Sequence, residues 1–249
     1  MDRVDRILEI LTGKEIVRIG MRVECSHCEQ SNWYSVDDLR RELKCHRCLR
    51  EYIFPSASPP SEWSYRTIGP FATENFAQGG YSVALALGAL GFRLGAEVTW
   101  IPSIELARSN EIKLEADFAM FWQYKHIRSG SSRLIFGECK SLNRFEMKDV
   151  ERMQELGSEF PSSVLVFCTL RSQLDWDEKK RIKRLVKAGR SSRGKTGNPV
   201  IVLTGLELLG TGIPNCWGKE AADVLTYART PRGLDEVAIL TQRLHLGST

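Results

Sequence analysis

Asp117-Phe-Ala-Met-Phe-Trp122 and Leu134-Ile-Phe-Gly-Glu-Cys-Lys140 are two apolar runs within residues 114–142, the stretch around which the chain is organised. On a strand, the side chains of residues i and i+2 share one face. Polar residues that include Ser-Gly-Ser-Ser separate the runs, as is typical of a turn. The pattern therefore predicts two strands paired antiparallel as a hairpin. Its open end would bring the aspartate of the first run beside the glutamate and lysine of the second.

The charged residues at this open end favour metal chemistry. Glu138 and Lys140 alternate with Cys139, so their side chains share a face, and Asp117 approaches from the neighbouring strand. Carboxylate oxygens are preferred ligands of hard cations such as Mg²⁺, and a nearby lysine can position the attacking water. Lone charges on a strongly apolar strand are costly unless they are paired or bound to metal. The alternative interpretation is a surface hairpin with scattered charges.

The flanking segments supply further strands and helices. A helix is predicted before the hairpin at residues 72–92, and residues 103–113 read as a loop. Strands are predicted at 98–101, 164–170 and 200–204, and helices at 145–156, 178–188, 221–227 and 234–244.

With Asp117, Glu138 and Lys140 in this order, and 20 residues between the aspartate and the glutamate, the chain resembles the PD-(D/E)XK, or restriction endonuclease-like, nuclease superfamily. The likeness extends over residues 74–209, and alanine stands at the position of the motif's proline. The resemblance implies an α/β fold with a mixed central sheet flanked by helices. It also implies a metal-dependent nuclease that hydrolyses phosphodiester bonds, of DNA rather than RNA, in restriction, defence or repair.

The resemblance also implies roles for individual residues. Asp117 and Glu138 would hold Mg²⁺ or Mn²⁺, and Lys140 would orient the water. Glu74 or Gln78, one turn apart on the preceding helix, would complete the metal shell, with Glu115 as a secondary ligand. Two alternatives stay open. One is a non-catalytic nucleic-acid-binding protein that keeps the nuclease fold, and the other is a zinc-ribbon interaction module.

Four cysteines near the N-terminus predict a zinc site. Cys25 and Cys28 form one CxxC pair, Cys45 and Cys48 form another, and 16 residues separate the pairs. This spacing allows four thiolates to close one tetrahedral structural zinc site, and a domain this small needs the metal to fold. The segment resembles a zinc ribbon.

Composition and linker signals predict the domain boundaries. The chain of 249 residues, with 42% hydrophobic content and a net charge of +4, can hold one sizeable core and a small satellite domain. Residues 1–54 would form an N-terminal helix and the ribbon, the proline-rich residues 55–64 a linker, and residues 65–249 the nuclease-like domain. The sequence shows neither a secretory signal nor a membrane-spanning run, so a soluble, cytoplasmic protein without a membrane partner is expected. A homo-oligomer or a larger complex stays open.

Two basic clusters suggest nucleic acid as the partner. Residues around the second cysteine pair combine positive charge with Trp33 and Tyr34, which suits either a nucleic-acid patch or a solvated face. Residues 179–195 carry an excess of one sign on a predicted helix, which favours a polyanion. The residues expected to contact phosphate there are Lys180, Arg184, Lys187 and Arg190.

Overall fold

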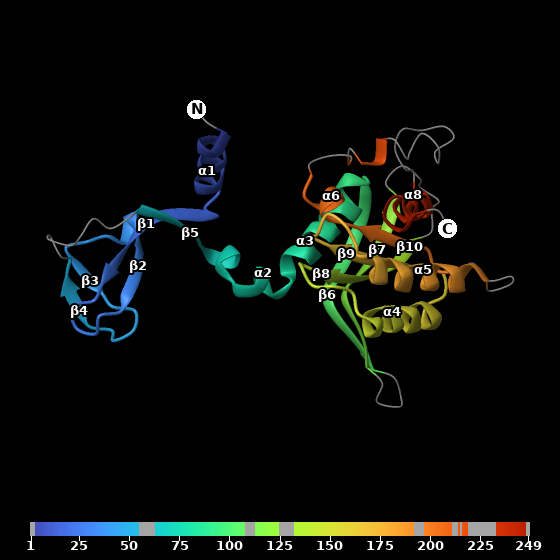
Figure 1. The fold of residues 1–249 in the computed structure, drawn as a ribbon, viewed down its shortest axis with the longest axis horizontal. Coiled ribbons are helices and arrows are strands. Elements are labelled where there is room, and N and C mark those ends of the chain that lie inside the picture. The colour runs from blue at the N-terminus through green and yellow to red at the C-terminus, as the bar shows by residue number, and fades with distance from the viewer. Residues whose placement is uncertain are drawn as a thin grey trace. The chain divides into compact units, whose positions relative to one another are not determined.

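The computed structural model describes residues 3–54, 63–107, 113–124, 132–191, 197–210, 214, 216–218 and 233–247. The chain divides into two compact units, Met1–Gln78 and Gly79–Thr249. Figure 1 labels their helices and strands.

The first unit contains an N-terminal helix of 11 residues, three shorter helical segments and two small sheets. Its three-stranded sheet has the order β2-β1-β5, with both pairs antiparallel, and β3 pairs with β4 as a separate hairpin. The elements are α1 (Arg3–Gly13), β1 (Val17–Glu24), β2 (Ser31–Ser35), η1 (Val36–Asp38), β3 (Glu42–Lys44), β4 (Glu51–Ile53), β5 (Trp63–Thr67), η2 (Gly69–Ala72) and α2 (Glu74–Gln78).

A small core joins the two sheets of this unit. Val23 and Tyr34 pack with Leu43, Tyr52 and the cysteine pairs. The Tyr34 ring is buried in this core, and its hydroxyl donates to Lys44 O at 2.7 Å. The expectation that Tyr34 belongs to an exposed basic surface is therefore wrong.

The division between the units lies later in the chain than the predicted linker. Residues 55–62 of that linker lie outside the described residues, but Trp63 and Ser64 already belong to β5. β5 pairs with β1 from Val17↔Thr67 to Met21↔Trp63. Because this pairing returns the chain to the first sheet, the first unit extends to Gln78.

The second unit is α/β, with a five-stranded mixed sheet flanked by helices. The strand order is β10-β9-β8-β7-β6, in which β6, β7 and β8 are antiparallel neighbours and β8, β9 and β10 are parallel neighbours. The elements are α3 (Gly80–Gly88), η3 (Ala89–Arg93), β6 (Ala96–Ala107), β7 (Lys113–Tyr124), β8 (Arg133–Lys140), α4 (Met147–Glu159), β9 (Val164–Thr169), α5 (Trp176–Ser191), β10 (Val200–Leu203), α6 (Gly205–Leu208) and α8 (Leu234–Leu246).

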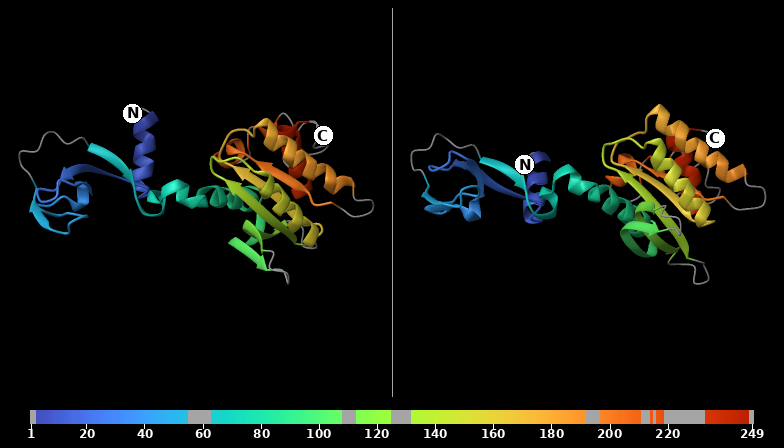
Figure 2. Two further views of the ribbon diagram at one scale, coloured as in Figure 1. Left: turned by 60° about the horizontal axis from the view of Figure 1, so that its bottom comes forward. Right: turned by 90° about the horizontal axis from the view of Figure 1, so that it is seen from below.

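Helices cover both faces of this sheet, as Figures 1 and 2 show. On one face, α4 and α5 lie side by side and bury Met153 and Ile182 against Phe136 and Phe167. On the other face, α3, α6 and part of α8 pack against strand side chains that point away from α4 and α5, among them Phe118, Ile135 and Val166. The parallel strands β9 and β10 are buried along their whole length, as their continuous apolar sequences predict.

Several predicted elements differ in extent. The helix expected at 72–92 is broken at Gly79, which has a left-handed backbone with φ 91°, and it ends in a π-helical turn. The loop expected at 103–113 is partly strand, because β6 continues to Ala107 and β7 begins at Lys113. The helix predicted at 221–227 lies outside the described residues. None of the described helices is long and apolar enough to cross a membrane.

Candidate functional site

The four predicted zinc ligands lie together in the first unit. The Sγ atoms of Cys25 and Cys48 are 3.8 Å apart, those of Cys28 and Cys45 are 3.6 Å apart, and all four lie within 4.8 Å of one another. All four are free thiols rather than disulfides. Close thiols in this number are compatible with a zinc ribbon.

The two cysteine pairs have the same local structure. In the first, Glu29 N donates to Cys25 O, and in the second, Leu49 N donates to Cys45 O. Glu29 and Leu49 both have positive φ, 57° and 61°, so each turn closes in the same way. Burial works against a thiolate at Cys45, but N–H groups of Cys48 and Arg47 outweigh it and lower the pKa of Cys45 to about 6. A thiolate that forms readily is the form that binds metal.

In the second unit, Asp117 and Glu138 lie at the end of the paired part of β7 and β8. The ladder runs from Trp122↔Arg133 to Phe118↔Gly137, and Asp117 is the next residue of β7. Just beyond the last backbone pairing, the Asp117 side chain links the two strands, because its Oδ2 accepts the backbone N–H of Cys139 at 2.5 Å. A Cβ on Gly137 would lie 1.9 Å from the Phe118 ring, so only glycine permits this close approach of the strands.

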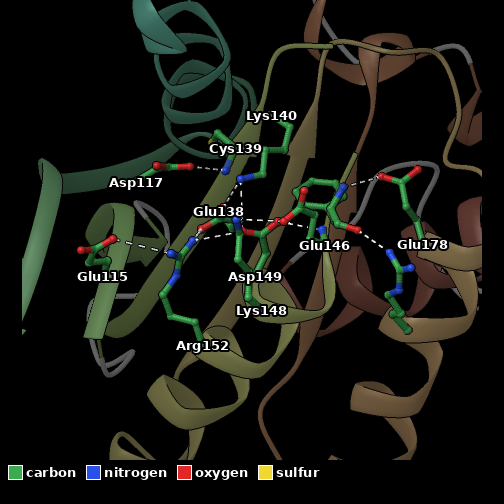
Figure 3. Close-up of polar contacts among 12 residues, drawn as sticks. Glu115, Asp117, Glu138, Cys139, Lys140, Glu146, Lys148, Asp149, Arg152 and Glu178 are labelled. Carbon is green, nitrogen blue, oxygen red and sulfur yellow. Dashed lines mark hydrogen bonds and ion pairs between the residues drawn. The ribbon is translucent and has the colours of Figure 1, made fainter. Parts of the chain in front are cut away.

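Lys140 and Arg152 bring positive charge to the same face of the sheet (Figure 3). Lys140 Nζ lies 2.8 Å from Glu138 Oε1 and 3.2 Å from Asp149 Oδ1. Arg152, from α4, places its NH2 2.5 Å from Glu138 Oε2 and 3.4 Å from Asp149 Oδ1. Glu138 and Asp149 are each only 1% exposed, whereas the side chains of Lys140 and Arg152 remain partly exposed.

The surroundings shift the pKa values of these groups. Burial raises the pKa of Asp117, against the N–H of Cys139 and the charge of Lys140. Burial also raises the pKa of Glu138, and the charge of Asp117 raises it further. For Lys140, burial opposes the ammonium form, but the hydrogen bond and charge of Glu138 and the charge of Asp149 prevail and raise the pKa. Lys140 therefore stays protonated at neutral pH.

The cluster carries an unbalanced negative charge. Asp117, Glu138 and Asp149 contribute −3, and Lys140 and Arg152 contribute +2, which leaves −1. Carboxylate oxygens such as those of Asp117 and Glu138 are of the kind that a divalent cation prefers. However, both oxygens of Glu138 already contact cations, so a metal would have to displace Arg152 or Lys140 from one of them. Within the described part of the chain, only the four cysteines gather three or more ligand atoms within 4.8 Å.

Of the other predicted ligands, Glu115 lies at the margin of this cluster, whereas Glu74 and Gln78 belong to the other unit. Glu74 is exposed in α2 and belongs to the first unit, as does Gln78, whose side chain lies outside the described residues. Glu115 is 51% exposed and reaches Arg152 NH1 at 3.6 Å. It therefore joins the ion-pair network at its exposed edge.

The sequence pattern did not identify Asp149 or Arg152 as members of the site. Arg144, Lys148 and Arg152 form a row on α4, but Arg144 pairs with Asp175 and Lys148 with Glu146, both largely exposed. Asp149 also accepts the Glu146 N–H at 2.8 Å, which is part of a capping box that begins α4. The sequence signal that could have identified Asp149 is its position as an acidic residue in the first turn of the helix after β8.

A second buried carboxylate fixes the loop between β8 and α4. Glu178 Oε1 accepts the Phe145 N–H at 2.7 Å and contacts Arg171 NH2 at 2.5 Å. Arg181 NH1 donates to Phe145 O at 2.9 Å. The start of α5 thereby holds the loop that follows Lys140.

The predicted phosphate-contacting residues lie on α5. Lys180, Arg184 and Lys187 are exposed, whereas the side chain of Arg190 lies outside the described residues. Lys180 Nζ lies 4.7 Å from the centroid of the Trp176 ring, which is 69% exposed. The exposed side of α5 thus combines positive charge with an aromatic ring.

Comparisons with protein-family models, with curated proteins and with solved structures gave no match.

Proposed function

We propose that the second unit is a metal-dependent nuclease with a restriction endonuclease-like core, and that it hydrolyses phosphodiester bonds of DNA rather than RNA. The observation that carries this proposal is the meeting of Asp117 and Glu138 where β7 and β8 stop pairing, with Lys140 on the same face as Glu138. The exposed cations of α5 support a polyanionic substrate.

Asp117 and Glu138 are the residues that would hold Mg²⁺ or Mn²⁺, which when bound neutralises charge on the scissile phosphate. Lys140 is protonated, so it would donate hydrogen bonds to the attacking water or to the phosphate rather than remove a proton. Glu138 has a raised pKa and accepts a proton more readily than an exposed glutamate. Asp149 would keep Lys140 in place through their ion pair.

One observation favours the non-catalytic alternative, in which the fold binds nucleic acid without hydrolysis. The carboxylate of Glu138 is already paired on both oxygens, with Lys140 and with Arg152. A site completed by ion pairs needs no metal for stability. This protein would then bind DNA equally well with and without divalent cations.

A cleavage assay separates the two functions. Wild-type protein is incubated with single-stranded and duplex DNA, with Mg²⁺, with Mn²⁺ and without either. Asp117→Asn keeps an oxygen for the Cys139 N–H but removes the charge, and Lys140→Ala removes the ammonium. The matched control is Lys148→Ala, which removes the same charge from an exposed pair on α4.

We expect metal-dependent cleavage by wild type and the control, and loss of cleavage by both site variants with DNA binding retained. Equal cleavage by wild type and both site variants would show that hydrolysis occurs elsewhere. Binding by wild type without cleavage under either metal would support the non-catalytic alternative.

A further inference from the structure

One face of the three-stranded sheet in the first unit concentrates arginines around a tryptophan. Residues directly opposite in antiparallel strands share a face. Arg18 lies opposite Arg66, and Arg22 lies opposite Trp33. Since residues i and i+2 also share a face, these four side chains project from the same side, here named the arginine–tryptophan face.

The Trp33 ring is built into this face. A Cβ on Gly20 would lie 2.6 Å from the indole, so the ring lies directly over the backbone of the central strand. The indole Nε1 donates to Ser64 Oγ at 3.1 Å, which fixes the ring between β2 and β5. The Arg66 guanidinium lies 5.8 Å from the ring centroid, within the range of a cation–π contact. Trp33 is therefore held as a flat, partly exposed platform.

The surface around Trp33 is hollowed and positively charged. A hollow of about 810 Å³ is lined by Arg22, Gln30, Ser31, Trp33, Ser64, Tyr65 and Arg66. Arg47 donates to Gln30 Oε1 at 3.3 Å and adds another guanidinium beside it. Glu24 is the only carboxylate in the sequences of β1, β2 and β5, against three arginines, so these strands carry +3 − 1 = +2.

The opposite side of the sheet is used in a different way. Val23 and Tyr34 project from it and pack into the core shared with the cysteine pairs. Core packing therefore accounts for Val23 and Tyr34 on that side, but it does not explain why arginines surround a partly exposed indole on the other. Guanidinium groups neutralise phosphates, and an aromatic ring stacks on any exposed base.

We propose that the arginine–tryptophan face binds single-stranded nucleic acid. One base stacks on Trp33, and Arg18, Arg22 and Arg66 contact the backbone phosphates on either side. A single strand is favoured over a duplex because the bases of a duplex are stacked on each other and cannot reach the indole. This binding needs no metal at Asp117 and Glu138, so it is independent of the proposed hydrolysis.

The experiment measures binding of the full-length protein to labelled oligonucleotides by fluorescence anisotropy, with no divalent cation added. The probes are single-stranded DNA, single-stranded RNA of the same sequence, and duplex DNA. The variants are Arg22→Ala/Arg66→Ala, whose side chains are exposed, and Trp33→Leu. The matched control is Arg40→Ala/Arg41→Ala, which removes the same charge from exposed positions of the same unit.

We expect Trp33→Leu to weaken single-strand binding about tenfold or more through loss of stacking. The Arg22/Arg66 pair should reduce the slope of log K against log salt by about 1.4, since each phosphate contact contributes about 0.7. The control should change neither quantity. Unchanged zinc content of each variant shows that the unit is folded, and the exposed arginine pair tests the proposal even if Trp33→Leu is destabilised.

Binding of either the DNA or the RNA strand supports the proposal and identifies the source of the ligand. Equal losses in the arginine pair and in the control would overturn it, as would a loss of duplex binding in the arginine pair as large as its loss of single-strand binding. Competition by a polyglutamate peptide as effective as that by single-stranded DNA would also overturn it, because the face would then recognise an acidic protein. Loss of cleavage with intact single-strand binding would refute only the proposed hydrolysis.

Discussion

Replacement of Arg152 by methionine tests the charge balance of the carboxylate site. Arg152 contacts Glu138 at 2.5 Å and Asp149 at 3.4 Å, and its side chain is 25% exposed. Methionine keeps an unbranched apolar stem and a good helix propensity, so the change removes chiefly the charge. The net charge of Asp117, Glu138, Asp149 and Lys140 alone becomes −3 + 1 = −2.

Without a divalent cation, Arg152→Met should lower the free energy of unfolding by about 2–3 kcal/mol. A hydrogen bond to a charged group contributes ~1.5–3 kcal/mol, and breaking a fully buried ion pair costs ~3–5 kcal/mol. Because Arg152 is partly exposed, we expect the loss of unfolding free energy to lie in the lower part of these ranges. For a unit of this size, each kcal/mol corresponds to ~2–4 °C, so the melting temperature should fall by about 4–12 °C.

Mg²⁺ should restore much of this loss, because the freed Glu138 oxygen becomes available as a ligand. A cation at 100 times its dissociation constant stabilises the folded state by ~2.7 kcal/mol. The assay is thermal unfolding followed by circular dichroism, with and without Mg²⁺, for wild type, Arg152→Met and Lys148→Met. The control removes an exposed cation from the same helix and should melt as wild type does under both conditions.

The reasoning would be refuted if Arg152→Met melted at the wild-type temperature, since the ion pair with Glu138 would then be unimportant. A destabilised variant that gains no more from Mg²⁺ than wild type does would count against Glu138 as a metal ligand. That second outcome would leave the ion pairs as purely structural contacts.

Three further outcomes are expected. Elemental analysis should find about one zinc per chain, and Cys45→Ala should lose it and unfold the ribbon locally; protein with reduced cysteines and no zinc would contradict this. Replacing Lys180, Arg184 and Lys187 by glutamate should weaken DNA binding for all sequences and flatten its salt dependence. Unchanged affinity at low salt would show that these side chains are only solvated and do not contact DNA. Burial raises the pKa of Glu207, but the hydrogen bonds with His245 Nε2 at 2.6 Å and with Thr204 outweigh it and hold the pKa below the ordinary 4.5. The stability that these hydrogen bonds give is therefore present above that pH and is lost as the pH falls. The stability difference between wild type and Glu207→Gln should therefore shrink as the pH falls below about 4.5 in denaturant titrations, and a constant difference would exclude this linkage.

The hairpin and the position of its charges could be predicted because they depend on local periodicity. Alternation along β8 places Glu138 and Lys140 on one face, and the antiparallel pairing of β7 with β8 sets Asp117 near them. The contribution of α4 could not be predicted in the same way. Which of its side chains face the site depends on how the helix packs on the sheet, and only the structure shows that Arg152 turns inward while Lys148 does not.

The arginine–tryptophan face depends on a pairing that the sequence conceals. Residues 55–62 contain three prolines and three serines, which indicated a linker and a domain boundary. β5 follows that segment and returns to pair with β1, so Arg66 and Ser64 reach Trp33 across more than 30 positions of sequence. A long-range pairing of this kind is specified by the fit of side chains across the sheet, which local patterns do not report.

The distribution of charge, rather than its sum, is the argument for nucleic acid. A net charge of +4 on 249 residues is too small to indicate a polyanion. However, the carboxylates Glu138, Asp149, Glu178 and Glu207 are buried and engaged by protein groups, so they contribute little to the field at the surface. Exposed cations lie on α5 and on the arginine–tryptophan face, among other places on the surface. Because the two surfaces lie on different units, removing the cations of one should leave the salt dependence that the other contributes, and the two losses should add.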